Sequence, residues 1–306
     1  MVNYENASPV VKHIYNQVFN ENRDFRILMT GSVGTGKSFS SLRIAEIFNP
    51  DFDVKRQTIF TKEEFNETLE YYKNRRKEIT DSNLKPSEKT KLINKEIRGR
   101  VIIVDESGIV ADATKWQDSE VKNIKYNLQS IRYLGLILIF NLPQSSDFLK
   151  SGRQLMDMYC ETARAPSFSL RKTYVKVYLY KKNLFTKAGR ELKKFSYYTE
   201  EGYPEELSVW ELSKPKRKLW QPYERYSHMK KDQIANEENT KDYENQLKDS
   251  RLINLILYNY SNKVQSVKEI AEILEVSEST IRKYINQGKV KLKKLHNMKS
   301  KNFGIY

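Results

Sequence analysis

Short, mostly apolar runs recur along the first half of the chain. The clearest are Phe25–Thr30, Val101–Val104 and Leu136–Phe140, and Gln57–Phe60 is a weaker run of the same kind. Runs of this length predict strands buried on both faces of a parallel sheet, because helices on either side cover both faces.

Amphipathic segments separate these runs. Ser8–Asn20 has one apolar face and Pro9 at its first helical position, and Ser38–Phe48 has a similar apolar side. Thr61 is a predicted helix N-cap, since a glutamate follows three positions later. Trp116–Arg132 also has a helical pattern. Strands that alternate with helices predict an α/β domain with a doubly wound, mostly parallel sheet.

The pattern changes in the next part of the chain. Val175, Val177 and Leu179 alternate with tyrosines and a lysine, and Lys193–Tyr198 has the composition of a hairpin partner. Such alternation is typical of half-exposed antiparallel strands, so we expect an edge ribbon at about residues 170–200.

Two segments are rich in charge. Asn74–Arg98 has few apolar residues and predicts a solvated helical insertion, with folding against a partner or nucleic acid as the alternative. Residues 213–247 mix prolines with basic and acidic clusters, which indicates a linker of mixed helix and coil. We therefore expect an α/β domain at residues 1–212, this linker, and a small all-α domain at residues 248–306.

The C-terminal domain has the spacing of a helix-turn-helix between residues 266 and 285, preceded by a supporting helix at Arg251–Tyr260. Ala271 is small enough for two helices to approach, and Ser277 is the predicted N-cap of the second helix. Glu275 stands where glycine is usual, so a standard turn requires a left-handed backbone there. The expected apolar core, with Val276 in the turn, consists of Leu252, Ile253, Leu255, Ile256, Leu274, Val276, Ile281 and Ile285.

The chain of 306 residues carries a formal charge of +15, which indicates a polyanionic partner. Nucleic acid is the first candidate and an anionic membrane surface is the second. A general lysine bias is the alternative to both.

Other compositional features narrow the class of protein. A single cysteine, Cys160, excludes an internal disulfide and a multi-cysteine zinc site, which favours a reducing cytoplasm, either the cell's own or that of a host. The three histidines show no metal-binding spacing. The N-terminus has no apolar stretch typical of a signal peptide, and the longest apolar run, Leu134–Phe140, is far shorter than the roughly 20 residues that span a bilayer. We expect a soluble protein without its own membrane segment.

Residues 31–38 match the phosphate-binding pattern G-x-x-x-x-G-K-[ST] at every fixed position. Glycines allow a tight turn that points successive N–H groups at phosphate oxygens. Lys37 then reaches the β and γ phosphates, and the Ser38 hydroxyl ligates Mg²⁺. A strand before the loop and a helix after it supply the expected context. The predicted ATP-binding residues are Gly31, Ser32, Val33, Gly34, Thr35, Gly36, Lys37, Ser38 and Phe39.

A carboxylate at the end of another buried strand supplies the second half of such a site. Asp105 and Glu106 directly follow Val101–Val104. We expect Asp105 to hold Mg²⁺ together with Ser38, and Glu106 to polarise the attacking water. The sequence thus predicts a RecA-like (ASCE) P-loop NTPase fold with a mostly parallel sheet, extended by the small helix-turn-helix domain.

Amides and arginines are further candidates for the reaction. Asn141 and Gln144 follow the strand at Leu136–Phe140, where either amide is expected to hydrogen-bond the water or the γ-phosphate; a plain strand-end cap is the alternative. Arg132 and Arg153 are candidates for an arginine finger inserted into a neighbouring subunit, and surface or structural roles are the alternative.

The order of these motifs resembles the HerA/FtsK superfamily of DNA-pumping ATPases. The resemblance covers roughly residues 20–165 and includes the segment Asn127–Phe140, in which an arginine precedes a glycine and an aliphatic strand, and then Gln144. The sequence is most similar to Zot-like ATP-binding proteins of viruses, plasmids and archaeal mobile elements, in which an Asp-Glu-[Ala/Ser]-Gly motif precedes a tryptophan. Residues 105–108, Asp-Glu-Ser-Gly, and Trp116 match that motif.

The resemblance implies a role for each matching residue. Lys37 and Ser38 would bind nucleotide and Mg²⁺, Asp105 would bind Mg²⁺, Glu106 would act as base and Gln144 as sensor. Asn141, Leu142 and Pro143 replace the small or hydroxyl residues that are usual before this glutamine. The resemblance further implies a homo-oligomer, in the form of a hexameric ring.

The C-terminal domain supplies candidate DNA contacts. On a docked recognition helix, hydroxyl and basic side chains would face base edges or phosphates, and the basic tail would bind phosphates electrostatically. A three-helix interaction module with a solvated basic tail is the alternative. The predicted contacts are Ser277, Ser279, Thr280, Arg282, Lys283, Lys289, Lys291, Lys293 and Lys294.

These observations favour an ATP-hydrolysing motor or remodelling ATPase of a mobile element, acting on DNA in packaging, transfer or replication. One alternative is an AAA+-type helicase loader or replication initiator, with Asn141 as a sensor. Another is a DNA-binding regulator that uses ATP as a switch with little turnover. A fourth is an ATPase of virion assembly or secretion that works with a separate membrane or capsid subunit.

Overall fold

The computed structural model describes residues 7–105, 131–145, 153, 155–162, 172–182, 190–261 and 265–286. The chain divides into two compact units, Met1–Lys231 and Asp232–Tyr306.

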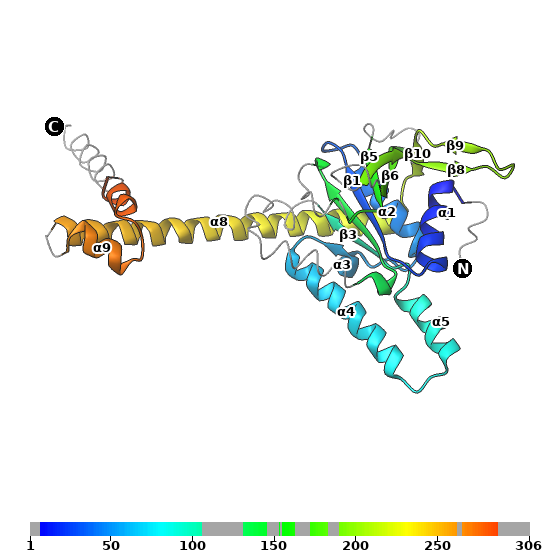
Figure 1. Cartoon of the computed structure of the whole chain (residues 1–306), viewed down its shortest axis with the longest axis horizontal. Coiled ribbons are helices and arrows are strands. Elements are labelled where there is room, and N and C mark those ends of the chain that lie inside the picture. The colour runs from blue at the N-terminus through cyan, green and yellow to red at the C-terminus, as the bar shows by residue number, and fades with distance from the viewer. Residues whose placement is uncertain are drawn as a thin grey trace. The chain divides into compact units, whose positions relative to one another are not determined.

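A mixed sheet with strand order β10-β6-β5-β1-β4-β3-β2 forms the centre of the first unit (Figure 1). Five of its strands run parallel: β1 (Phe25–Thr30), β2 (Thr58–Ile59), β3 (Val101–Asp105), β4 (Ile137–Leu142) and β5 (Met158–Thr162). Antiparallel strands extend the β5 side: β6 (Lys172–Lys182), β7 (Arg190–Lys194) and β10 (Trp210–Ser213). The structure therefore confirms the predicted doubly wound α/β fold with a mostly parallel sheet, the RecA-like fold of P-loop NTPases.

Alternate side chains of the parallel strands fill two hydrophobic layers. On one face, Ile27 and Met29 of β1 pack in a core with α1 (Pro9–Tyr15) and α2 (Lys37–Phe48). On the other face, Leu28 packs in a core with α4 (Lys62–Asp81). Because strand side chains alternate between faces, continuous apolar runs are required to fill both layers.

The segment around β2 differs from its prediction. Only Thr58 and Ile59 form the strand, since Gln57 belongs to a short helix, α3 (Val54–Gln57). Asp53 caps this helix by accepting hydrogen bonds from the N–H groups of two residues that follow it. The buried Gln57 side chain donates to the Val101 carbonyl at 2.8 Å, so its polar group links α3 to β3.

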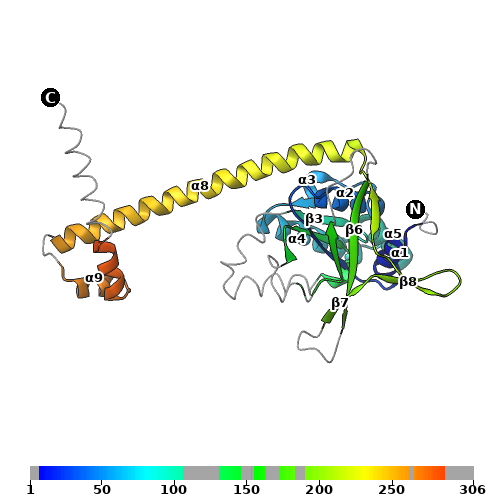
Figure 2. The same cartoon turned by 90° about the horizontal axis from the view of Figure 1, so that it is seen from above.

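The structure also places the charged segment at residues 74–98 and the described parts of the alternating segment at about residues 170–200. Residues 74–98 cover the second half of α4 and α5 (Pro86–Glu96), a helix without buried residues; the two helices form a hairpin (Figure 1). β6 pairs with β7, whereas β8 (Ser196–Tyr198) pairs with β9 (Pro204–Glu206) in a separate hairpin (Figure 2).

Three further helical segments occur among the described residues of the first unit and its continuation. The segment expected at Ser8–Asn20 forms α1 followed by a π-helical turn, η1 (Asn16–Asn20). Arg132 begins a 3-10 turn, η2 (Arg132–Leu134), and residues 116–130 of the predicted helix before it lie outside the described part of the chain. α8 is one helix from Arg217 to Ser261, where the sequence predicts mixed helix and coil. Residues that favour helix, among them lysine, glutamate, glutamine and leucine, recur along α8 and outweigh the single Pro222.

The second unit contains a small helical core. Ile256 of α8 packs with Ile270 and Ala271 of α9 (Val267–Ile273), and with Ile281 and Ile285 of a helix covering residues 278–286. Ile256, Ile281 and Ile285 of the predicted core are confirmed, Leu274 packs against them half-buried, and Ile253 is buried. The side chain of Leu252, also predicted for this core, lies outside the described residues.

The turn between these two helices has the predicted backbone. Glu275 has φ of 53°, in the left-handed region, and the Val276 N–H bonds to the Ala271 carbonyl at 3.0 Å. Ser277 caps the second helix through the Thr280 N–H. Two predicted core positions are wrong, because Val276 is 40% exposed and Leu255 is 57% exposed.

Candidate nucleotide site

The phosphate-binding loop joins the end of β1 to the start of α2. Gly36 has φ of 95° and occupies the N-cap position of α2, so the helix begins at Lys37. The N–H groups of the first helical turn and the partial positive charge of the helix face the loop, as phosphate binding requires. The loop is anchored at its start, where the Gly31 N–H donates to the Pro143 carbonyl after β4 at 3.3 Å.

Close packing and a positive φ angle both require glycine at position 31. Its φ is 146°, and a Cβ placed on it would lie 1.9 Å from Oγ1 of Thr162. Thr162 ends β5, the neighbour of β1, and its hydroxyl lies 2.6 Å from that of Thr35. The first loop glycine is therefore needed for the end of β5 to approach the loop.

Lys37 is folded back onto the loop. Its ammonium donates to the carbonyl oxygens of Gly31 at 2.7 Å and Ser32 at 3.1 Å, and the side chain is buried. A buried ammonium must be paired with acceptors, and these carbonyls supply them. The side chain thus lies across the mouth of the loop where the phosphates are expected.

Asp105 faces the loop from the end of β3. β4 lies between β1 and β3, and its residue Asn141 is aligned with Met29 on one side and with Asp105 on the other. The Asn141 amide donates to Oδ1 of Asp105 at 3.0 Å and accepts from the Ser41 hydroxyl at 2.7 Å. Both polar ends of Asn141 are therefore engaged with protein groups, and the residue orients the Asp105 carboxylate.

Tyr223, from the first turns of α8, contacts the other oxygen of Asp105. Its hydroxyl donates to Oδ2 of that carboxylate, and its ring is buried. Burial raises the pKa of Tyr223 well above its usual value, and the charge and hydrogen bond of Asp105 raise it further. Hydrogen bonds with the side chains of Ser38 and Ser227 lower that pKa, so the hydroxyl lies beside both predicted Mg²⁺ ligands.

Ser38 and Asp105 fit a magnesium site. A hydroxyl and a carboxylate are hard oxygen donors of the kind that Mg²⁺ prefers. Both interact with the single hydroxyl of Tyr223, so the two predicted ligands lie near one another. Glu106, the predicted base, lies outside the described residues.

The remaining predicted catalytic residues are spread around the sheet. Gln144 follows β4 and is exposed. Arg132 lies before β4, at the edge of the sheet opposite the loop, so it cannot reach the nucleotide site of its own chain. Arg153 donates to the Ser145 carbonyl at 2.8 Å.

The predicted DNA contacts belong to the second unit. Ser277, Ser279, Arg282 and Lys283 are exposed, and Thr280 is half-buried. Three of them form a hydroxyl cluster, in which the Ser277 oxygen lies 2.7 Å from that of Ser279 and 2.9 Å from that of Thr280. Lys289, Lys291, Lys293 and Lys294 lie outside the described residues.

Sequence reasoning missed two residues of this site. Thr162 belongs to β5, whose short alternating pattern was not recognised as part of the parallel sheet. Tyr223 lies in the segment interpreted as a linker, and no local spacing connects it to Asp105, 118 positions away in the sequence.

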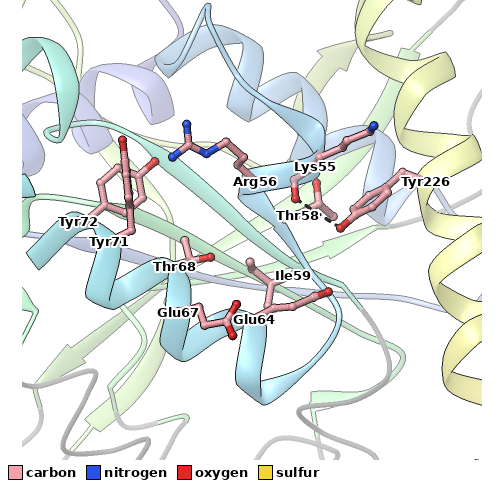
Figure 3. A pocket seen from close by; sticks show the side chains of 10 residues that line it. All are labelled: Lys55, Arg56, Thr58, Ile59, Glu64, Glu67, Thr68, Tyr71, Tyr72 and Tyr226. Carbon is pink, nitrogen blue, oxygen red and sulfur yellow. Dashed lines mark hydrogen bonds between the residues drawn. The ribbon is translucent and has the colours of Figure 1, made fainter. Parts of the chain in front are cut away.

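A separate pocket of about 240 Å³ lies between α3, β2, α4 and α8 (Figure 3). The Arg56 guanidinium lies 4.6 Å from the Tyr71 ring centre, and burial raises the pKa of Tyr72 to about 12. The Tyr226 hydroxyl, from α8, points into this pocket and donates to the Lys55 carbonyl at 3.4 Å. Tyr226 therefore contacts a different part of the unit from Tyr223.

The described residues show two further features. None of their helices is long and apolar enough to cross a membrane, and they contain no group of three or more metal-ligating side chains. Cys160 is free and buried in β5, and burial raises the pKa of its thiol.

No protein-family model matches the sequence, and no curated protein does. Among solved structures, the genome packaging NTPase of Sulfolobus turreted icosahedral virus 2, in complex with AMP, is 18% identical, with a TM-score of 0.26 over 45% of this chain and 75% of that chain. A KaiC-like protein from Pyrococcus horikoshii OT3 is 13% identical, with a TM-score of 0.26 over 57% of this chain and 95% of that chain.

The N-terminal domain of zonular occludens toxin from Neisseria meningitidis is 17% identical to the chain. Its TM-score is 0.29, over 65% of this chain and 98% of that domain. With such low scores, the fold assignment rests on the strand order and the loop geometry and not on these neighbours.

Proposed function

We propose that the chain is an ATPase that acts on DNA, as a motor or remodelling protein of a mobile element. One observation carries the ATPase part: Lys37 and Ser38 follow β1 and Asp105 ends β3, so all three lie at the carboxyl edge of the parallel sheet, where one Tyr223 hydroxyl contacts both Ser38 and Asp105. The Asp105 carboxylate is also fixed in place, because the Asn141 amide donates to its Oδ1.

In the proposed reaction, water attacks the γ-phosphate in line with the leaving group. The loop N–H groups and Lys37 hold the phosphates, Glu106 orients the water, and Asn141 keeps Asp105 directed at Ser38. Mg²⁺, when bound between Ser38 and Asp105, offsets the phosphate charge. Arg132, on the opposite edge of its own sheet, would act only in a neighbouring subunit of a ring.

The helices of the second unit support the DNA part of the proposal. A left-handed turn residue, Glu275, and a capped second helix are features expected of a helix-turn-helix, and exposed hydroxyl and basic groups lie on that second helix. The charge of +15 favours a polyanion. The proposed setting is a cytoplasm, the cell's own or that of a host.

Phosphate release in the presence and absence of duplex DNA, at two salt concentrations, tests the proposal. We expect Lys37→Ala and Glu106→Gln to abolish turnover, because each removes a group that acts on the transferring phosphate. Lys12→Ala, an exposed lysine on α1, is the matched control and should retain full turnover. Undiminished hydrolysis by purified Glu106→Gln would overturn the catalytic assignment.

Hydrolysis and binding assays with DNA distinguish the alternative functions, and a mass measurement tests the oligomeric state. Hydrolysis stimulated by DNA supports a motor, whereas ATP-dependent binding to one defined DNA sequence without turnover supports a regulator. A mass measurement in ATP tests the proposed ring. A monomer in ATP would remove the basis for an arginine finger in trans.

A further inference from the structure

The first turns of α8 are docked on the start of the P-loop helix. The Trp220 ring centre lies 4.2 Å from that of Phe39, the residue directly after Ser38, and the Lys214 ammonium lies 5.2 Å from the same Phe39 ring. Trp220 is also stacked on Tyr223 at 5.8 Å. Aromatic contacts therefore fix this part of α8 directly beside the predicted nucleotide site.

In this docked arrangement, Tyr223 occupies one oxygen of Asp105, a predicted magnesium ligand. Protein donors already occupy both oxygens of Asp105, Asn141 at Oδ1 and Tyr223 at Oδ2. Asp105 is only 2% exposed and Tyr223 only 3%, so the ring fills the space beside the carboxylate. A Mg²⁺ ion, or one of the waters that it keeps when it binds, would need the Oδ2 atom that the Tyr223 hydroxyl occupies.

We infer that Tyr223 is a displaceable gate on the magnesium site, closed when the first turns of α8 are docked and open when a Mg²⁺-nucleotide binds. This inference rests on the proposed function. Docking of Tyr223 and binding of the metal compete for Oδ2 of Asp105. Only molecules with an open gate bind Mg²⁺-nucleotide, so the apparent affinity equals the intrinsic affinity multiplied by the open fraction. A nucleotide without Mg²⁺ does not need Oδ2 and does not meet the gate.

Nucleotide affinity in two conditions tests the gate. Titration calorimetry with a non-hydrolysable ATP analogue is performed once with Mg²⁺ and once with excess chelator. Tyr223→Phe keeps the ring and removes the hydrogen bond to a carboxylate, so we expect about tenfold tighter binding with Mg²⁺ and unchanged binding without it. Tyr226→Phe, one turn further along α8, removes a hydroxyl that bonds to the Lys55 carbonyl and to the Lys230 side chain, and should change neither affinity.

Hydrogen exchange on the unmodified chain gives a second readout that does not depend on any variant. Adding the Mg²⁺-analogue should increase amide exchange in residues 217–231, while amides of α2 become more protected. Equal affinities of wild type and Tyr223→Phe with Mg²⁺, or unchanged exchange in residues 217–231 on binding, would overturn the gate and leave the proposed function standing. Failure of the wild-type chain to bind the analogue in either condition overturns the proposed function itself.

Discussion

Buried polar residues of this protein are joined in short chains of hydrogen bonds. Ser41 donates to Asn141, Asn141 donates to Asp105, and Tyr223 donates to the second oxygen of the same carboxylate. In a low-dielectric interior, a buried charge left without partners is costly, so each member of the chain fixes the next. The orientation of Asp105 is thus set by residues from α2, β4 and α8.

A buried ion pair at the start of β1 gives a prediction for stability. Arg26 and Asp24 are each 4% exposed, and the guanidinium lies 2.5 Å from the carboxylate. Asp24→Ala removes this carboxylate from a buried cation and should lower the free energy of unfolding by about 3 kcal/mol in urea denaturation. The exposed Asp51→Ala is the matched control and should change it by less than about 0.5 kcal/mol. Equal effects of the two changes would contradict a structural role for the pair.

His13 gives a prediction for pH. It packs edge-on against Phe25 and Phe195, and burial lowers its pKa below the usual value, with Glu21 acting in the opposite direction. The unfolded chain therefore binds the proton more readily, so the free energy of unfolding should fall as pH drops below about 6.5, with a slope of at most about 1.4 kcal/mol per pH unit. Denaturant melts of His13→Gln should show a smaller decrease, and an identical pH profile for the two proteins would refute this assignment.

Hydrogen bonds with nearby side chains set where helices of this protein begin. Thr61 caps α4 through the Glu64 N–H, and Ser266 caps α9 in a reciprocal pair with Glu269. Both caps follow from a hydroxyl and a glutamate three positions apart, a signal contained in the sequence itself. The limits of β2 do not follow from such a signal, because the Gln57 side chain is recruited to link α3 with β3.

Glu275 gives a prediction at the scale of the α9 turn. A residue with a side chain in the left-handed region costs about 1 kcal/mol relative to glycine. Glu275→Gly should therefore stabilise the second unit by about 1 kcal/mol, measured by native-state hydrogen exchange of amides at residues 267–286. Glu272→Gly, exposed and inside α9, should destabilise it by a similar amount. Changes of the same sign in both variants would show that the turn is not strained at Glu275.

At the scale of the whole molecule, the chain combines a P-loop fold with a small helical unit and a high positive charge. The proposed DNA contacts lie in the second unit, and the predicted nucleotide site lies in the first. α8 extends from Arg217 to Ser261 and carries Tyr223 near its start. One helix therefore supplies both a contact to Asp105 and part of the core of the second unit.

Salt dependence tests the DNA contacts. Lys283→Ala should weaken binding to duplex DNA by a similar factor for all sequences, and should reduce the slope of log affinity against log salt by about 1, because one phosphate contact is lost. Lys268→Ala, an exposed lysine of α9 outside the predicted set, is the matched control. Fluorescence anisotropy at several salt concentrations gives both quantities, and equal slopes for the two variants would remove Lys283 from the interface.

The sequence by itself determined the features that depend on near neighbours in the chain. The glycines of the loop, the buried strands, the helix caps and the left-handed residue at 275 all follow from local backbone and solvation requirements. The carboxylate at the end of β3, Asp105, likewise follows from the sequence as a partner of the loop, because parallel strands share one edge.

Only the tertiary structure decided which side chains meet at that edge. Strand order placed Asn141 between Met29 and Asp105 and turned its amide toward the carboxylate, and β5 brought Thr162 against Gly31. The contact of Tyr223 with Asp105 joins positions far apart in the sequence. Such contacts arise from the packing of whole elements, and no local pattern of residues encodes them.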